Sequence, residues 1–175
     1  SGHYRVVAQK TLLPNYDVFN ERRYFEPHTS NDGDNCFEFR SKRFGVAICE
    51  DTWNDSTFWT NRRYAKDPVE SLAASGIDAI LSIGASPFSQ GKPQLRERIF
   101  GHSAKRFKKP FFLAGQVGAN DQIVFDGGSM VLDGKGDAVL RLPLFEEALK
   151  VVDFDDEGRV STKEEKGDFE DGLSQ

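Results

Sequence analysis

Three short runs of almost wholly apolar residues stand out along the chain, at 44–48, 79–83 and 111–114. Each run is long enough for one strand and lacks the alternation of apolar and polar residues that a half-exposed strand shows. Runs of this kind are typical of strands that are buried on both faces of a parallel sheet. The sequence therefore predicts three central strands at these positions.

Helix signals fill the two intervals between these strands. Asp67 and Pro68 form a helix start, in which an N-cap precedes proline at the first helical position, and Gly76 ends the helix. The interval 93–109 has apolar residues on one side and basic residues elsewhere, as an amphipathic helix does. Strands that alternate with helices in this way predict an α/β layered fold.

The flanking segments predict further strands and loops. The polar and aromatic stretch at 15–27 has no clean period and is interpreted as a structured loop, and 31–35 is interpreted as a turn. Shorter strands are expected at 4–8, 36–39, 130–132, 138–140 and 149–152, of which the last three form a meander.

Composition narrows the class of protein. Hydrophobic residues make up 38% and charged residues 29%, which is typical of a soluble globular chain. No apolar run approaches the roughly 20 residues of a membrane helix, and the first residues do not form a signal peptide. The two cysteines, Cys36 and Cys49, are too few for a disulfide framework. We therefore expect a cytoplasmic protein with no membrane partner.

Charge is concentrated towards the end of the chain. Residues 155–175 hold eight acidic and three basic side chains, a difference that equals the whole net charge of −5. We interpret 1–154 as the folded domain and 155–175 as an acidic linker or tail. The neutral body gives no electrostatic reason to expect nucleic acid as a partner.

Cys49 is the first candidate for chemistry, because it follows the strand at 44–48 and α/β proteins bind ligands at the carboxyl ends of their strands. A thiol there is nucleophilic when a nearby cation or backbone amide favours the thiolate. The alternative is a buried structural cysteine, which is our interpretation of Cys36. Three histidines share no metal-ligand spacing, so no metal is implied.

Lys10 is the second candidate, since it follows the strand expected at 4–8. Its ammonium can then meet Cys49 across the strand ends and stabilise the oxyanion that forms when sulfur attacks a carbonyl. Taken alone, Lys10 is an ordinary solvated surface charge.

Six strings in order along the chain resemble a known family. Three are similar to the nitrilase, or carbon–nitrogen hydrolase, superfamily: KTLLP at 10–14, ERRYFEP at 21–27 and GVAICED at 45–51. Three more are similar to the glutaminase domains of glutamine-dependent NAD synthetases: LPNY at 13–16, ASPF at 85–88 and VFDGGS at 124–129. The resemblance implies an α-β-β-α sandwich and a Glu-Lys-Cys catalytic triad.

The resemblance also implies roles for individual residues. Cys49 is matched to the nucleophile, Lys10 to the triad lysine, and Glu21 to an additional glutamate that orients this lysine. Four residues match contacts of the substrate glutamine: Tyr16, Glu50, Ser86 and Lys92. The backbone N–H of Glu50 is expected in the oxyanion hole and its carboxylate at the substrate's α-amino group. Ordinary loop packing of Tyr16 and Ser86, and a plain surface cation at Lys92, are the alternatives.

This sequence differs from the family pattern in two ways that limit these expectations. The triad glutamate of the family lies upstream of the lysine, and residues 1–9 contain no Asp or Glu. We therefore expect the sandwich to be incomplete at its N-terminal side and this chain alone to be inactive. The ATP-binding synthetase domain of the family is also absent from this chain. ATP and Mg²⁺ are expected to bind in that synthetase domain, whereas the glutaminase domain is expected to need no cofactor of its own.

The sequence thus predicts the glutamine amidohydrolase part of an NAD synthetase, which passes ammonia to ATP-dependent amidation of deamido-NAD. Another amidase or N-carbamoyl amide hydrolase of the superfamily is the alternative enzyme. A non-catalytic assembly module is the third reading, since family members form homo-oligomers and Phe58, Trp59 and Phe145 are expected to be exposed. The stretch 54–66, rich in aromatic and Arg residues, either caps the pocket or meets a neighbouring subunit.

Overall fold

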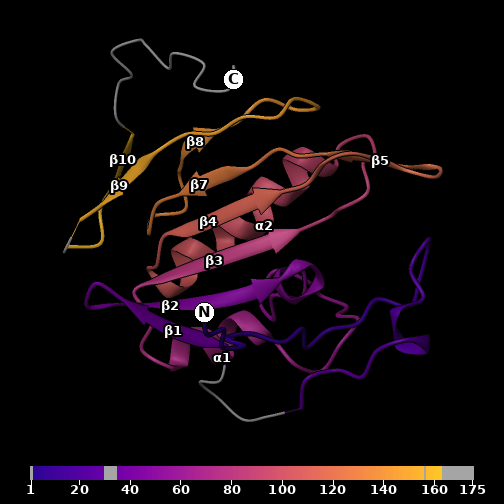
Figure 1. Cartoon of the computed structure of the whole chain (residues 1–175), viewed down its shortest axis with the longest axis horizontal. Coiled ribbons are helices and arrows are strands. Elements are labelled where there is room, and N and C mark those ends of the chain that lie inside the picture. Colours follow the sequence, from indigo (N-terminus) through magenta and orange to yellow (C-terminus); the bar gives the residue numbers. More distant parts are fainter. Residues whose placement is uncertain (1, 30–34, 156, 163–175) are drawn as a thin grey trace.

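A computed structural model describes residues 2–29, 35–155 and 157–162. Its main feature is a six-stranded sheet with strand order β1-β2-β3-β4-β7-β8 (Figure 1). The strands of this sheet are β1 Cys36–Phe39, β2 Lys42–Ile48, β3 Ala79–Gly84, β4 Phe111–Gly115, β7 Met130–Leu132 and β8 Ala138–Arg141. Strands β2, β3 and β4 run parallel, while β1, β7 and β8 are added antiparallel at the two sides.

The two helices that connect the parallel strands begin and end close to where the sequence predicts. Helix α1 spans Pro68–Ala74, and the Asp67 side chain accepts a hydrogen bond from the Glu70 backbone N–H at 3.1 Å, as an N-cap does. Gly76 follows with a φ of 72°, a conformation that glycine adopts without steric cost. Helix α2 spans Lys92–Phe107, one residue earlier at its start than expected.

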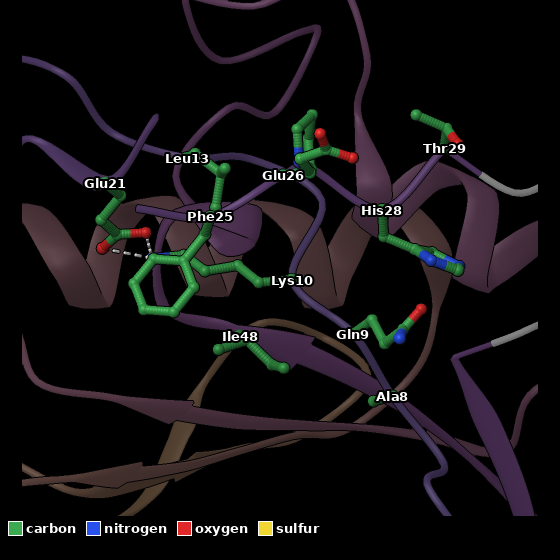
Figure 2. A pocket seen from close by; sticks show the side chains of 11 residues that line it. Ala8, Gln9, Lys10, Leu13, Glu21, Phe25, Glu26, His28, Thr29 and Ile48 are labelled. Atoms are coloured by element: carbon green, nitrogen blue, oxygen red, sulfur yellow. Dashed lines mark hydrogen bonds and ion pairs between the residues drawn. The ribbon is translucent and has the colours of Figure 1, made fainter. Parts of the chain in front are cut away.

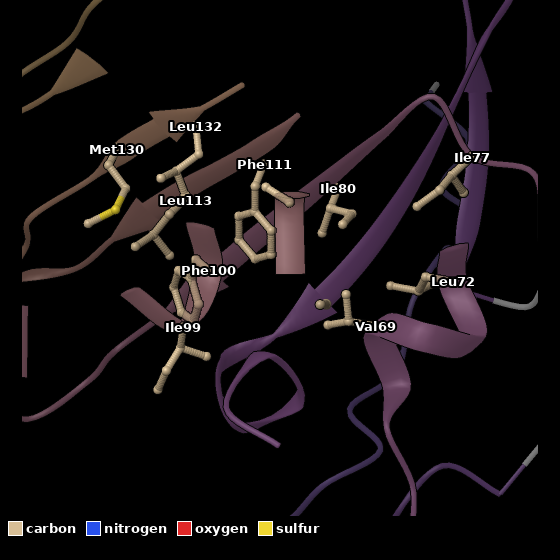
Figure 3. Packing of buried hydrophobic residues seen from close by; sticks show 12 residues of the cluster. Val69, Leu72, Ile77, Ile80, Ile99, Phe100, Phe111, Leu113, Met130 and Leu132 are labelled. Atoms are coloured by element: carbon tan, nitrogen blue, oxygen red, sulfur yellow. The ribbon is translucent and has the colours of Figure 1, made fainter. Parts of the chain in front are cut away.

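The hydrophobic core lies between the sheet and these helices (Figure 3). Phe100 of α2 stacks on Phe111 of β4 with ring centroids 4.8 Å apart, and both side chains are almost fully buried. The other buried members come from α1, α2, four strands and the connection between α1 and β3: Ala47, Val69, Leu72, Ile77, Ile80, Ile99, Ala104, Leu113, Met130 and Leu132. Burial of this set stabilises the layered arrangement by roughly 1.5–3 kcal/mol for each large side chain.

The opposite face of the sheet is covered only in part in the described residues. On β2, Gly45 and Ala47 are buried, whereas Phe44, Val46 and Ile48 are half-buried. The prediction that this strand is buried on both faces is therefore wrong for one face. Phe154 covers some of it, since its ring contacts Phe44 at 6.1 Å and Phe112 at 5.9 Å between centroids.

Two other predicted strands differ from the structure. Residues 4–8 form no strand and pair with none in the described part of the chain, so the strand predicted there is wrong. Instead, the Asn35 side chain hydrogen-bonds the backbone N–H and carbonyl of Gln9, at 3.0 and 2.8 Å. The expected strand at 149–152 is shifted to β9 Val152–Phe154, which pairs with β10 Val160–Thr162 rather than with the meander.

Strand β10 lies inside the segment interpreted as a linker, and a turn closed by Asp155 joins it to β9. The predicted turn at 31–35 falls mostly on residues outside the described ones, as does the rest of the tail from 163 onward. No helix in the described ranges is long and apolar enough to span a membrane.

A hairpin that sequence reasoning missed projects from the sheet beside the strand ends. It is formed by β5 Val117–Asn120 and β6 Ile123–Asp126. At its base the chain passes very close to β4, because a Cβ on Gly115 would lie 2.1 Å from the Gly127 carbonyl oxygen. Glycine is therefore required at this crossing.

Candidate active site

The carboxyl ends of the three parallel strands form the floor of the candidate site. Ile48 pairs with Ile83 in register, and Gly84 with Gly115, so Cys49 lies at the same edge as these two glycines. Cys49 begins the 3-10 turn η2 Cys49–Thr52 with a φ of 49°. A left-handed backbone is costly for a non-glycine residue, and such strain clusters at functional sites.

Lys10 and Glu21 form an ion pair at this edge. The Lys10 Nζ lies 2.7 and 2.5 Å from the two Glu21 carboxylate oxygens, and both side chains are mostly buried. Glu21 begins the short 3-10 turn η1 Glu21–Arg23. Figure 2 shows the Lys10 side chain pointing towards Glu21, with the Phe25 ring beside it and Ile48 below. Glu21 thus holds the Lys10 ammonium in one place.

Asp51, which the sequence analysis did not single out, ties the Lys10 segment to the Cys49 turn. Its carboxylate accepts hydrogen bonds from the backbone N–H groups of Thr11 at 3.1 Å, Leu12 at 2.7 Å and Ile48 at 3.1 Å. The side chain is 1% exposed. Two segments about 40 positions apart in sequence are therefore fixed to each other through one carboxyl group. Only its place two residues after the candidate nucleophile hinted at this role.

The pKa of Asp51 gives a test of this connection. Burial raises it from 3.8 to about 6, although the three backbone N–H groups and Lys10 act in the opposite direction. The folded protein then binds this proton more tightly than the unfolded chain, so the group's contribution to stability falls as the pH rises from 3.8 to about 6 and stays constant above. We expect the free energy of unfolding of the natural protein, minus that of Asp51→Asn, to fall by roughly 3 kcal/mol across this window.

Chemical denaturation at several pH values between 4 and 8 measures this difference. A difference that is flat or rises between pH 4 and 6 would show that Asp51 is not protonated in the folded state. Asp153→Asn, an exposed carboxyl on β9, is a matched control variant.

Lys10 and Cys49 open into the same cavity, as the sequence analysis predicted. The cavity has a volume of about 640 Å³ and is lined by Lys10, Phe19, Glu21, Ile48, Cys49, Ile83, Gly84, Ala85, Pro87, Ala114, Gly115, Gln116, Ile123 and Phe125. A second cavity of about 740 Å³ shares Lys10, Glu21 and Ile48 with it (Figure 2). The ion pair therefore lines both cavities.

The electrostatics of Cys49 reflect these neighbours. Burial raises the pKa of the thiol, while the Lys10 ammonium lowers it, Glu50 raises it, and a hydrogen bond from the Ala85 backbone N–H lowers it. A buried thiol of this kind depends on Lys10 and Ala85 for any thiolate that it forms. The arrangement suits attack of sulfur on a carbonyl-type carbon with a cation beside the developing oxyanion.

The structure also brings Tyr16 and Glu50 together. The Tyr16 hydroxyl donates to both carboxylate oxygens of Glu50, at 2.8 and 2.9 Å, and Glu50 is 5% exposed. The Tyr64 phenol lies beside the same carboxylate. Burial, with Glu50 next to each phenol, raises the pKa of both tyrosines, so both remain protonated donors at neutral pH. Tyr64 was missed, because nothing in the sequence relates it to Glu50.

Ser86 and Lys92 lie nearby in different settings. Ser86 lines a small cavity of about 20 Å³ together with Cys49 and the buried Ser82. The Lys92 Nζ donates to the Pro87 carbonyl at 2.8 Å and lies 5.5 Å from the centre of the Trp53 ring. Burial lowers the pKa of Lys92 and Arg96 lowers it further, whereas Cys49 raises it. Their roles in substrate binding stay predictions.

A second buried feature missed from sequence is an ion pair behind the site. Arg96 of α2 donates to both oxygens of Asp126 on β6, at 2.8 and 3.0 Å, and to the Gly127 carbonyl at 2.9 Å. The two side chains are 2% and 1% exposed. The amphipathic pattern predicts Arg96 on the basic side of the helix, whereas its side chain points into the protein.

The three apolar residues expected to be exposed differ in how far they are buried. Phe145 is 49% exposed, as expected. Phe58 and Trp59 instead pack against the core as partly buried side chains, and the Trp59 Nε1–H donates to the Trp53 carbonyl at 2.7 Å. That expectation is wrong for these two residues, because their loop folds back onto α2. Within the described ranges no group of three or more His, Cys, Asp or Glu side chains is placed to hold a metal ion.

Comparisons with known proteins place this geometry in a family. The model of the family described as carbon–nitrogen hydrolase matches residues 2–164. A glutamine-dependent NAD(+) synthetase of Synechocystis sp. is 42% identical over 154 residues, which is 88% of this chain and 27% of that protein. The corresponding protein of Thermotoga maritima is 37% identical over 160 residues, with 88% and 25% covered. The chain thus spans about a quarter of the length of these curated relatives.

Solved structures agree on the fold. Glutamine-dependent NAD+ synthetase from Acinetobacter baumannii, in complex with ADP, superposes with a TM-score of 0.76 at 32% identity, over 93% of this chain and 28% of that one. A carbon–nitrogen hydrolase from Helicobacter pylori has a TM-score of 0.65 at 19% identity, over 79% and 48% of the two chains, and shares the nitrilase-type α/β fold. From the family match and the shared fold, the chain belongs to the carbon–nitrogen hydrolase family.

Proposed function

We propose that this chain forms the glutamine-hydrolysing part of a glutamine-dependent NAD synthetase. The observation that carries the proposal is the shared cavity of Cys49 and Lys10, with Lys10 held by Glu21. The relatives that support the choice of substrate are named as glutamine-dependent NAD(+) synthetases. With this function, each residue of the predicted site has its own role.

In the proposed reaction the Cys49 sulfur attacks the side-chain amide carbon of glutamine and forms a tetrahedral intermediate. The Lys10 ammonium and the backbone N–H of Glu50 stabilise its oxyanion. The amide nitrogen takes up the proton that the thiol lost, the C–N bond breaks, ammonia leaves, and a Cys49 thioester remains. Attack of water on the thioester releases glutamate and restores the thiol.

Recognition of glutamine rather than a simple amide is assigned to Glu50. Its neighbours Tyr16 and Tyr64 are phenols and not cations, so the carboxylate can still pair with an ammonium. An α-ammonium group of the substrate supplies that partner. Ser86 and Lys92 are proposed as further contacts of the amino-acid end.

We propose that the general base that takes the thiol proton is a carboxylate outside this chain. The two glutamates that affect Cys49 are already engaged, Glu21 by Lys10 and Glu50 by the tyrosines. Without that base the rate falls by about 10² to 10⁴. In the full-length protein, the released ammonia then amidates deamido-NAD in an ATP-dependent, Mg²⁺-dependent synthetase domain, while the glutaminase part needs no cofactor. Assembly into homo-oligomers in the cytoplasm stays a prediction.

Covalent labelling tests the proposal. We expect 6-diazo-5-oxo-norleucine, an electrophilic analogue of glutamine, to modify Cys49 in the full-length protein and to abolish release of glutamate from glutamine. Peptide mass spectrometry locates the label. Cys49→Ala should give no label and no activity, whereas Cys36→Ala, a cysteine on the outer strand β1, should leave both unchanged.

Equal labelling of Cys36 would contradict the assignment of the nucleophile. Hydrolysis of simple amides or N-carbamoyl compounds in preference to glutamine would favour another amidase of the family. Absence of both labelling and hydrolysis would favour a non-catalytic module.

A further inference from the structure

The loop at 54–66 is closed at its base by one buried side chain. Asn54 is 3% exposed, and its Nδ2 donates to the backbone carbonyls of Tyr64 at 2.9 Å and Lys66 at 2.6 Å. The Tyr64 backbone N–H donates back to the Asn54 Oδ1 at 3.4 Å. The two ends of the loop are therefore fixed to each other.

The same loop is attached to helix α2 by buried carboxylates. Asp55 accepts from the Ser103 hydroxyl at 2.9 Å and lies 3.4 Å from the Arg106 Nη1. Asp67 accepts from the Ser56 backbone N–H at 2.8 Å and from Arg106 at 3.1 Å. Arg106 thus joins the start of the loop to its end, and the loop has a fixed position on the helix.

From this position the far part of the loop reaches the residues that follow Cys49 and Lys10. The Arg63 guanidinium carbon lies 3.9 Å from the centre of the Tyr16 ring, a close cation–π contact. The phenol of the next residue, Tyr64, lies beside the Glu50 carboxylate that accepts from Tyr16. Glu50 is therefore flanked by two phenols, of which Tyr16 donates to it and is itself covered by Arg63.

We propose that the loop 54–66 is a specificity element of the glutamine site, in which Tyr64 and Arg63 position the Glu50 carboxylate for the substrate's α-ammonium group. Tyr64 acts directly on the carboxylate, and Arg63 acts through the Tyr16 ring. Preorganisation of this kind strengthens binding because the groups need not be ordered when substrate arrives. The inference rests on the proposed function, because it depends on Glu50 as the group that binds the substrate's α-ammonium.

Kinetics of the full-length protein test it with two substrates, glutamine and 4-carbamoylbutanoate, which is glutamine without the α-amino group. Tyr64→Phe removes only the hydroxyl and should lower kcat/KM for glutamine about tenfold, the size expected for one hydrogen bond to a charged group. The loss should fall on KM, with kcat changed less than about twofold. Arg63→Met should act in the same direction by about threefold. Neither variant should change kcat/KM for 4-carbamoylbutanoate.

Tyr24→Phe is the matched control, because it makes the same chemical change on a phenol that is 70% exposed. Thermal unfolding of each variant reports whether it is folded. A loss of equal size for both substrates, or no loss for glutamine, would overturn the role of the loop while leaving the glutaminase proposal in place. A natural protein that releases no glutamate from glutamine would overturn both.

Discussion

Replacement of Lys10 by methionine should lower kcat for glutamine hydrolysis by about 10² to 10³ in the full-length protein. Lys10 is a cation that shares the cavity of about 640 Å³ with Cys49, and Glu21 fixes it there through two short contacts. An ammonium that stabilises an oxyanion acts mainly in the transition state, so kcat should fall much more than KM changes. Release of glutamate measures both constants.

The same variant should change the titration of Cys49. Because the Lys10 ammonium lowers the pKa of this thiol, its removal should raise the pKa further, and alkylation of Cys49 by iodoacetamide should then need a higher pH. Lys135→Met, a lysine in the exposed turn before β8, is the matched control and should behave like the natural protein. A Lys10→Met enzyme with a nearly natural rate would exclude Lys10 from the oxyanion site.

The second large effect is a loss of stability on replacement of the buried Arg96. Arg96→Met should lower the free energy of unfolding by about 3–5 kcal/mol, because it leaves the buried Asp126 carboxylate and the Gly127 carbonyl without their donor. Methionine retains most of the apolar part of the side chain, so the loss reports the missing charge and hydrogen bonds. Urea denaturation measures it.

A neighbouring ion pair provides the comparison. Arg141 forms a two-pronged contact with Glu97, the residue after Arg96, but both side chains are exposed to a large degree. Arg141→Met should therefore cost only about 0–1 kcal/mol. If the two variants were equally stable, the Arg96–Asp126 pair would not be desolvated in solution as it is in the structure.

Much of the fold follows from local patterns. The central strands and both helices lie within about two residues of their predicted positions, because apolar runs, the Asp67-Pro68 start and the closing glycine act over short distances. The failures come from strand pairings that local composition does not reveal. Residues 4–8 have the composition of a strand but no neighbouring strand among the described residues. The hairpin β5–β6 and the pairing of β9 with β10 depend likewise on partners that composition does not reveal.

The site divides in the same way. The sequence by itself determined the chemical groups and their order: the thiol after a buried strand, the lysine after Gln9, and the acids at 21 and 50. Only the tertiary structure decided which of them meet, since Asp51 fixes Thr11 and Leu12 to the Cys49 turn and Glu21 turns Lys10 towards the cavity. It also decided that Tyr64 faces Glu50. The reason is physical: a hydrogen bond between side chains 10 to 40 positions apart depends on packing of the whole layer, which no local pattern encodes.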